Sequence, residues 1–261
     1  MSWQFWLVKI RTERKKVMAN KLDAMREGGE ILGRILAELR GYVQVGMNEK
    51  DIDKWVEGKI LGYGAEVAYY EEEPNFPGAI CISVNDELIH GVPEDNVLED
   101  GDKVSFDLSI KYQGYYVDSA FTMIIGKGGP ALKHLLSCTE NALYEGIKQV
   151  KAGVALGDIG AAVEAVLEKG KLGIIRNYVG HGIGERIHMP PDIPNFGRRG
   201  EGYVLSAGET ICIEPMASLG KADTVVGKDG WTVFLKDGSI GAHFEHTILV
   251  TEEGCEILTK A

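Results

Sequence analysis

The most informative stretch of the chain is V-S-F-D-L-S-I-K-Y-Q-G-Y-Y-V-D-S-A-F, residues 104–121. Its apolar and β-branched residues on either side of a short polar segment predict a β-hairpin. A turn at Tyr112-Gln113 pairs Asp107 directly with Asp118 and places their Cβ atoms about 5 Å apart on one face. Two carboxylates so close in a half-buried sheet repel each other unless a cation lies between them. The pattern therefore indicates a divalent metal site, and the alternative is a pair of solvated acids on an exposed strand face.

Three further residues favour the metal site over that alternative. Glu214 lies in I-C-I-E-P and Glu245 in H-F-E-H-T-I-L-V, apolar strand patterns in which an unpaired carboxylate is costly. His181 lies in Y-V-G-H-G-I-G, where flanking glycines leave the imidazole accessible to a metal. Together with Asp107 and Asp118 the set supplies four negative charges, which match two divalent ions. Oxygen-rich ligation with one nitrogen and no thiolate suits Mn, Fe(II), Co or Zn, in a carboxylate-bridged pair about 3.5–4 Å apart.

The predicted elements form two similar sets, each with two helices followed by strands, and the hairpin belongs to the first set. Apolar residues at three-to-four spacing predict a long helix over residues 13–42, bent or split at Gly28-Gly29, and further helices over residues 48–62, 130–151 and 156–169. Apolar runs predict strands over residues 79–84, 103–110, 115–125, 172–179, 210–216, 232–235 and 242–250.

The two sets align with each other at a constant offset of 107 residues. This offset aligns Leu36 with Leu143, Gly46 with Gly153, Asp51 with Asp158, Leu98 with Leu205, and Asp107 with Glu214. Any two helix–turn–helix segments resemble each other, but one fixed offset across about 70 residues favours a duplication. We therefore predict a pseudo-twofold α+β fold with the strands together and the helices outside.

The composition excludes several classes of protein. A chain of 261 residues that is 44% hydrophobic can form one compact unit with a sizeable core, and its net charge of −11 disfavours a nucleic-acid partner. Its apolar runs fall far short of the about 20 residues that a membrane span needs, so we expect neither an anchor nor a signal peptide. Its four cysteines form no C-x-x-C pair, which argues against a zinc knuckle and a disulfide framework. Unpaired cysteines fit a reducing cytosol.

A set of motifs, taken in order, resembles a known family. They are C-I-S-V-N-D-E-L-I-H-G-V-P, F-D-L with V-D-S-A-F, V-G-H-G-I-G with I-H, I-E-P-M, and E-H-T-I-L-V-T. This combination closely resembles type I methionine aminopeptidases of the pita-bread fold, over roughly residues 14–259. The resemblance implies a single catalytic domain over residues 14–261 after a 13-residue extension, with duplicated halves, a curved antiparallel sheet and outer helices. It also implies five metal ligands, with Asp118 and Glu245 bridging: Asp107, Asp118, His181, Glu214 and Glu245.

The same resemblance assigns roles around the metals. Glu214 corresponds to the general base, His90 to a histidine near the scissile nitrogen, and His188 to one that stabilises the tetrahedral oxyanion. Phe76, Cys81 and Trp231 correspond to the methionine pocket. A buried cysteine or tryptophan is more often an ordinary core residue, and a lone histidine is more often structural.

The chain departs from the family pattern beside this pocket. Residues 69–76, Y-Y-E-E-E-P-N-F, carry three acids, Glu71, Glu72 and Glu73, where relatives usually show aromatic and glycine residues. Ile187 replaces a frequent aromatic residue, and Met189 a common acid. These changes leave the metal centre intact and put the shape of the pocket and the substrate range in question.

Three other histidines are not expected in the site. His134 lies on a predicted helix and His243 on a predicted strand without motif support, so both are interpreted as structural. His246 follows Glu245 directly and should point to the opposite face of its strand.

The resulting hypothesis is a monomeric cytoplasmic metallohydrolase that removes initiator methionine when the second residue is small. Its partners would be the N-termini of nascent chains, with the ribosome as one place of action. A proline-directed peptidase of the same fold is the first alternative, although such relatives generally carry a separate preceding domain. A metal-free binding protein of this fold is the second, although that class loses the ligands.

Overall fold

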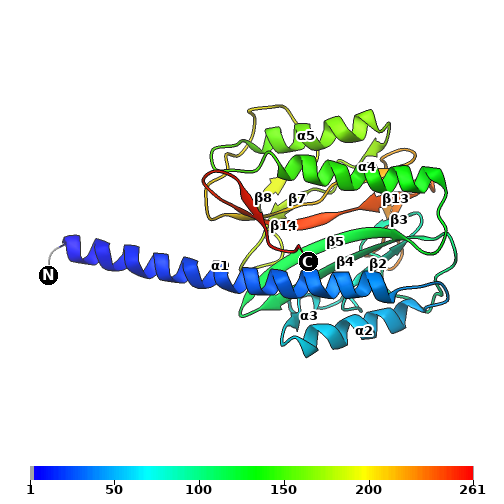
Figure 1. Ribbon diagram of the computed structural model, residues 1–261, viewed down its shortest axis with the longest axis horizontal. Coiled ribbons are helices and arrows are strands. Elements are labelled where there is room, and N and C mark those ends of the chain that lie inside the picture. Colours follow the sequence, from blue (N-terminus) through cyan, green and yellow to red (C-terminus); the bar gives the residue numbers. More distant parts are fainter. Residues whose placement is uncertain (1–2, 261) are drawn as a thin grey trace.

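A computed structural model describes residues 3–260 of the chain and the side chains of residues 20–260. Its main element is a nine-stranded antiparallel sheet in the order β1-β4-β5-β14-β9-β7-β8, with β2 on β4 and β15 on β14 (Figure 1). These strands are β1 (Glu66–Val67), β2 (Cys81–Val84), β4 (Lys103–Tyr112), β5 (Tyr115–Ile124), β7 (Gly180–Gly182), β8 (Met189–Ile193), β9 (Thr210–Ile213), β14 (Glu245–Val250) and β15 (Cys255–Ile257).

Two three-stranded sheets accompany the main sheet. One has the order β13-β10-β6 and the other β11-β12-β3. Their strands are β3 (Glu87–Ile89), β6 (Gly173–Ile174), β10 (Met216–Ser218), β11 (Thr224–Val226), β12 (Val233–Leu235) and β13 (Gly241–His243). Of the predicted strand over residues 172–179, only β6 forms. The predicted strand over residues 210–216 corresponds to β9 and β10, and that over residues 242–250 to β13 and β14.

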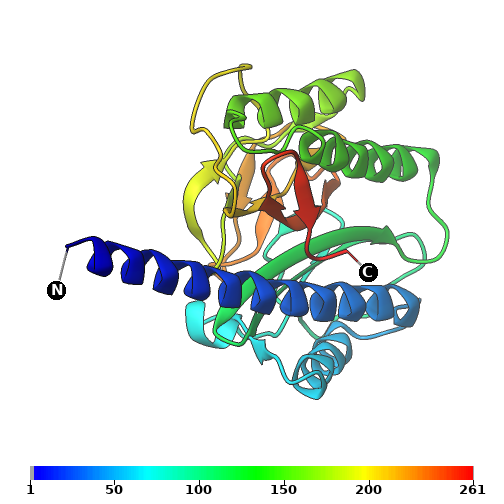
Figure 2. The same cartoon turned by 60° about the vertical axis from the view of Figure 1, so that its left-hand side comes forward.

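The helices form two pairs, one beside each half of the main sheet (Figures 1 and 2). α1 (Trp3–Tyr42) and α2 (Glu49–Gly62) accompany β4 and β5, while α4 (Pro130–Ile147) and α5 (Leu156–Lys169) accompany β9 and β14. A short helix, α3 (Tyr69–Glu72), precedes β2. None of the helices in residues 3–260 is long and apolar enough to cross a membrane.

One continuous helix replaces the bent helix that we predicted at the N-terminus. α1 begins at Trp3, so residues 3–13, predicted as an extension, continue the same helix, while Met1 and Ser2 lie outside the described residues. Gly28 and Gly29 do not bend it. A Cβ atom on Gly29 would lie 2.3 Å from the carbonyl oxygen of Leu258, so the glycine permits the C-terminal segment to pack closely against α1.

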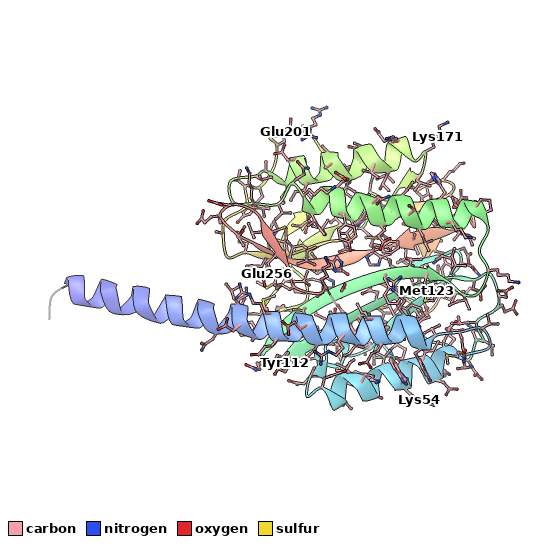
Figure 3. All side chains as sticks on the ribbon, viewed as in Figure 1. Lys54, Tyr112, Met123, Lys171, Glu201 and Glu256 are labelled. Carbon is pink, nitrogen blue, oxygen red and sulfur yellow. The ribbon has the colours of Figure 1, made fainter. Side chains whose placement is uncertain are left out.

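Side chains fill the space between the helices and the sheet (Figure 3). One apolar core runs through both halves, from Leu32 and Ile35 of α1 to Val163 and Leu167 of α5. Arg26 of α1 donates to the carboxylate of Glu256 on β15, with Nε 3.0 Å from Oε1, and this contact ties the first helix to the end of the chain.

The predicted duplication is confirmed in detail. Adding 107 to the bounds of α2 gives those of α5, and the isolated bridge Asn48–Val97 recurs as Ala155–Val204. Gly46 donates to the carbonyl of Leu98 at 2.8 Å, and the corresponding Gly153 donates to that of Leu205 at 2.8 Å. The two halves therefore share backbone hydrogen bonds as well as sequence.

The register of the β4–β5 hairpin differs from our prediction. The turn residues are Gln113 and Gly114, with φ of 49° and 85°, because a two-residue loop that matches the strand twist needs two positive φ angles. Asp107 consequently faces Ala120 and Asp118 faces Ser109, so the two acids are diagonal neighbours. A shift of two positions keeps both side chains on the same face, which preserves their proximity.

Candidate metal centre

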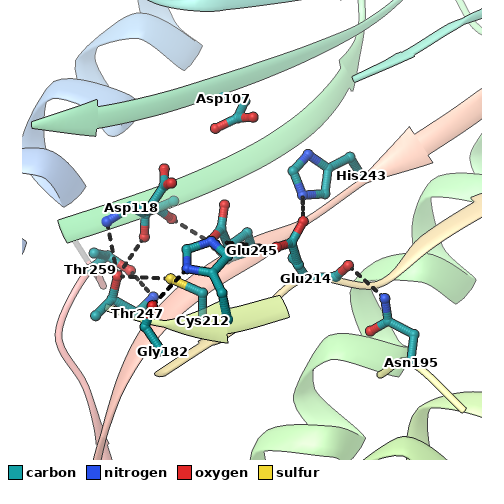
Figure 4. Close-up of polar contacts among 12 residues, drawn as sticks. Asp107, Asp118, Gly182, Asn195, Cys212, Glu214, His243, Glu245, Thr247 and Thr259 are labelled. Atoms are coloured by element: carbon teal, nitrogen blue, oxygen red, sulfur yellow. Dashed lines mark hydrogen bonds and ion pairs between the residues drawn. The ribbon is translucent and has the colours of Figure 1, made fainter. Parts of the chain in front are cut away.

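Five side chains from separate strands converge on one buried site (Figure 4). Asp107 lies on β4, Asp118 on β5, His181 on β7, Glu214 directly after β9, and Glu245 at the start of β14. Oxygen atoms of Asp107, Asp118 and Glu245 lie within 4.8 Å of one another. His181 Nε2 lies 3.5 Å from Glu214 Oε1 and 4.0 Å from Glu245 Oε1. The structure therefore brings together all five residues that the sequence singled out.

Neighbouring polar groups hold these side chains in place. Thr247 Oγ1 donates to the carbonyl of Asp118 at 2.8 Å and accepts from its N–H at 2.9 Å. His181 Nδ1 donates to the carbonyl of Gly182 at 3.0 Å, and Nε2 faces the carboxylates of Glu214 and Glu245. A Cβ atom on Gly180 would lie 2.2 Å from the carbonyl of Cys212, so a glycine is needed where β7 approaches β9.

The electrostatics of this cluster favour a cation. Burial raises the pKa of Asp107 and Glu245 well above the usual range and that of Glu214 to about 8, and the charge of Asp118 adds to each increase. Two buried oxygens, Asp118 Oδ1 and Glu245 Oε1, have no hydrogen-bond partner among the described residues. Buried carboxylates without partners are costly, and divalent ions with oxygen and imidazole ligands would satisfy them. The donor set therefore fits the metals expected from the sequence.

An apolar pocket of about 60 Å³ opens beside the carboxylates. Phe76, Cys81 and Trp231 line it, and the rings of Phe76 and Trp231 meet edge to face with centroids 5.5 Å apart. Asp107 and Asp118 line the same pocket. The three residues predicted to hold a methionine side chain are thus together and next to the cluster.

The family of the chain follows from a comparison with known sequences. The model of the metallopeptidase family M24 matches residues 23–252. The chain belongs to metallopeptidase family M24. This membership agrees with the buried carboxylate and imidazole cluster described above.

Relatives within the family M24 share nearly the whole length of the chain. It is 42% identical over 241 residues to the methionine aminopeptidase of Mycoplasma capricolum, covering 92% of this chain and 96% of the relative. It is 40% identical over 240 residues to methionine aminopeptidase 1 of Bacillus subtilis, covering 92% and 96%. The crystal structure of the Thermotoga maritima methionine aminopeptidase superposes with a TM-score of 0.90 at 39% identity, covering 93% and 97%. The predicted resemblance and the α+β pita-bread fold are confirmed.

A more distant solved structure shares the fold alone. The prolidase of Pyrococcus furiosus superposes with a TM-score of 0.74 at 23% identity, and the match covers 93% of this chain and 64% of the prolidase. The prolidase thus has a substantial part that the matched fold leaves uncovered.

Two predicted substrate-contacting histidines lie where the pocket meets the metal cluster. His90 and His188 line the apolar pocket and also a neighbouring cavity of about 250 Å³ that contains His181, Glu214 and Glu245. The rings of His181 and His188 meet with centroids 4.6 Å apart. Burial, with smaller contributions from neighbouring histidines, lowers the pKa of His90 to about 4, so its imidazole is neutral near pH 7.

One histidine of the site escaped the sequence interpretation. His243, interpreted as structural, is buried with Nε2 3.4 Å from Glu214 Oε2 (Figure 4). Burial lowers its pKa to about 4, so it is neutral near pH 7. The signal was present, because His243 precedes Glu245 by two residues, and alternate strand residues share a face.

The remaining polar candidates do not complete the cluster. His246 Nδ1 lies 2.9 Å from Thr259 Oγ1, away from the carboxylates, as the strand alternation predicts. His134 lies on α4 and donates from Nε2 to the carbonyl of Gly170 at 2.9 Å. Cys212 Sγ lies close to His181 and Glu245, but burial raises the pKa of this thiol well above its usual range, so it remains protonated and is a poor ligand.

Proposed function

We propose that this M24 chain is a metal-dependent aminopeptidase that removes methionine from the N-termini of peptides and nascent proteins when the second residue is small. The observation that carries the proposal is the position of the apolar pocket of Phe76, Cys81 and Trp231 directly against the carboxylate cluster. The names of the most similar relatives support the same substrate.

The residues that would hold two divalent ions in this proposal are Asp107, Asp118, His181, Glu214 and Glu245. The ions would be Mn, Fe(II), Co or Zn. When bound, they would polarise the scissile carbonyl and lower the pKa of a bound water molecule. The hydrogen bonds of Thr247 to the backbone of Asp118 and of Gly182 to the imidazole of His181 would help to position two of these residues.

The chain's own residues would then divide the proton transfers and the binding of substrate among them. Glu214 is the general base, because its carboxylate lies in the cluster and contacts the imidazoles of His181 and His243. His90, neutral near pH 7, would contact the substrate near the scissile nitrogen, and His188 would stabilise the oxyanion. Phe76, Cys81 and Trp231 would enclose the thioether side chain and exclude water from it.

The cellular setting is part of the proposal. Residues 14–261 would act as a single catalytic domain, as a monomer in the cytoplasm, on nascent chains at the ribosome or after their release. The matches to bacterial relatives, which cover 92% of the chain, support the single catalytic domain.

The test is a peptidase assay after chelation and after return of each metal separately. Met-Ala-Ser should be cleaved at its first bond only with metal, and Met-Leu-Ser much more slowly, since the second residue must be small. Ala-Pro-Ser should remain intact, and its preferential cleavage would identify a proline-directed peptidase instead. Metal content below one ion per chain after reconstitution would favour a metal-free binding protein.

A further inference from the structure

The three acids at the end of α3 differ in their partners. Lys111 donates to the carboxylate of Glu71, and Arg186 Nε donates to Glu72 Oε2 at 3.1 Å. Glu73 has no ion pair and no side-chain hydrogen bond among the residues whose side chains the structure describes. Two of the acids are therefore neutralised by neighbouring cations and the third is not.

The unpaired acid is also the one that lines the pocket. Glu73 is half-buried and contributes to the wall together with Phe76, Cys81, Ile187 and Trp231. Partial exposure keeps its carboxylate hydrated, so the residue is tolerated beside apolar walls. A pocket of this kind presents aromatic and aliphatic surface to a side-chain stem and one anionic group to its end.

We propose that Glu73 is a specificity-determining residue that extends the first-residue pocket to lysine. The four methylene groups of lysine would pack against Phe76 and Trp231, and its ammonium group would donate to the Glu73 carboxylate. No lysine or arginine of the described side chains pairs with this acid, so the ammonium group of the substrate would be its cationic partner. This inference rests on the proposed aminopeptidase activity at the same site.

The decisive comparison uses two first residues that differ only in the cation. Norleucine has the unbranched stem of lysine without the ammonium group. The ratio of kcat/KM for Lys-Ala-Ser to that for Nle-Ala-Ser should fall about tenfold in Glu73→Gln, the scale of one charge-assisted hydrogen bond in a partly buried site. Both peptides are measured on the same preparation of each variant, so any general loss of activity cancels in this ratio.

Glu71→Gln provides a matched control. It removes the same charge two residues away, from a carboxylate that pairs with Lys111. The long-range electrostatic change is similar in both variants, so the ratio in Glu71→Gln should equal that of the unmodified protein. Glu73→Asp, which keeps the charge on a shorter side chain, should retain an intermediate ratio.

A binding measurement on the metal-free protein separates recognition from catalysis. n-Butylammonium, a mimic of the lysine side chain, should perturb the NMR signals of Trp231 in the unmodified protein and in Glu71→Gln. The same titration should produce several-fold weaker binding in Glu73→Gln.

The outcomes distinguish this inference from the proposed function. Failure of the unmodified protein to cleave Met-Ala-Ser with any of the metals would overturn the proposed function. Cleavage of Met-Ala-Ser with an unchanged lysine-to-norleucine ratio in Glu73→Gln would overturn only the role of Glu73. Equal falls in Glu71→Gln and Glu73→Gln would also overturn it, because they would show a general effect of charge.

Discussion

The two halves of the sheet share one backbone plan and connect their central strands differently. In the first half, β4 and β5 are joined by the two turn residues Gln113 and Gly114. In the second half, the neighbouring strands β9 and β14 are joined by residues 214–244, which include β10 to β13. The long connection carries Trp231 and His243, and the short turn carries no counterpart of either.

This difference gives the second half two parts of the proposed site that the first half lacks. Asp107 and Glu214 occupy corresponding positions of the two halves, and Asp118 and Glu245 lie on the neighbouring strands β5 and β14. The duplicated frame thus supplies carboxylates in pairs. The unduplicated connection supplies Trp231 as one wall of the pocket and the buried imidazole of His243.

The largest predicted effect tests whether both halves contribute equally to the metal centre. Asp118→Ala and Glu245→Ala should each abolish peptidase activity and lower the metal content, because the remaining carboxylates cannot hold both ions. Elemental analysis and the Met-Ala-Ser assay check both variants. Asp51→Asn, which removes an exposed carboxylate of α2, is the control. Substantial turnover by Asp118→Ala in metal-free buffer would contradict the two-ion centre.

The next prediction concerns the histidines that line the pocket. His90→Ala and His188→Ala should keep their metal and lose about 100-fold or more in kcat, the scale of one acid–base or oxyanion partner. His134→Ala should be nearly silent, since its imidazole contacts the carbonyl of Gly170 and the thiol of Cys138, away from the carboxylate cluster. Similar losses in all three variants would mean that the first two act structurally.

A third prediction compares corresponding positions at the start of β4 and β9. Lys103 is fully buried and donates to the carbonyls of Ser83 and Glu87, at 3.1 and 2.8 Å, while the corresponding Thr210 donates to the carbonyl of Ile183. Burial lowers the pKa of Lys103 from 10.5 to about 7. Between these values the unfolded chain holds the proton and the folded chain does not, so the free energy of unfolding should rise with pH.

The rise should approach about 1.4 kcal/mol per pH unit between pH 7 and 10 and should flatten below pH 7, where both states are protonated. Lys103→Met should remove this slope. Urea denaturation at pH 7 and 9.5 measures the difference between the variant and the unmodified protein. Lys111→Met, which alters a partly exposed lysine, should keep the slope. The same pH dependence in all three proteins would contradict the assignment.

The smallest predicted effect tests the equivalence of the two backbones. Gly46 and Gly153 have φ of 89° and 83°, and a Cβ atom at either would meet nothing within 4 Å. Alanine at either position should therefore destabilise by the backbone cost alone, about 1–2 kcal/mol. Gly41→Ala, within α1 and also uncrowded, should be neutral or stabilising by up to about 1 kcal/mol. Thermal unfolding of the three variants gives the comparison, and a clearly unequal cost at Gly46 and Gly153 would contradict it.

Features that depend on local sequence could be predicted well. The bounds of α5, the N-cap of α2 at Asn48 and the two strands of the hairpin agree closely with the prediction. Both acids of the hairpin still lie on the predicted face of the sheet, because a shift of two positions in the register does not change the face. The turn itself was predicted one residue too early. A two-residue loop needs positive φ at both residues, and Gln113 and Gly114 adopt it.

The sequence by itself determined the duplicated α+β plan, the pairing of acids on its strands and the resemblance to the methionine aminopeptidases, because periodicity, a constant offset and the order of motifs can be found along the chain without knowing its contacts. Only the tertiary structure decided which residues of distant segments contact one another. The close packing of Leu258 against α1 explains why residue 29 is a glycine. Glu71 pairs with Lys111 and Glu72 with Arg186, whereas Glu73 lines the pocket. The contact of His243 with Glu214 arises in the same way. Such contacts join residues far apart in the chain, and their geometry is set by how whole elements pack.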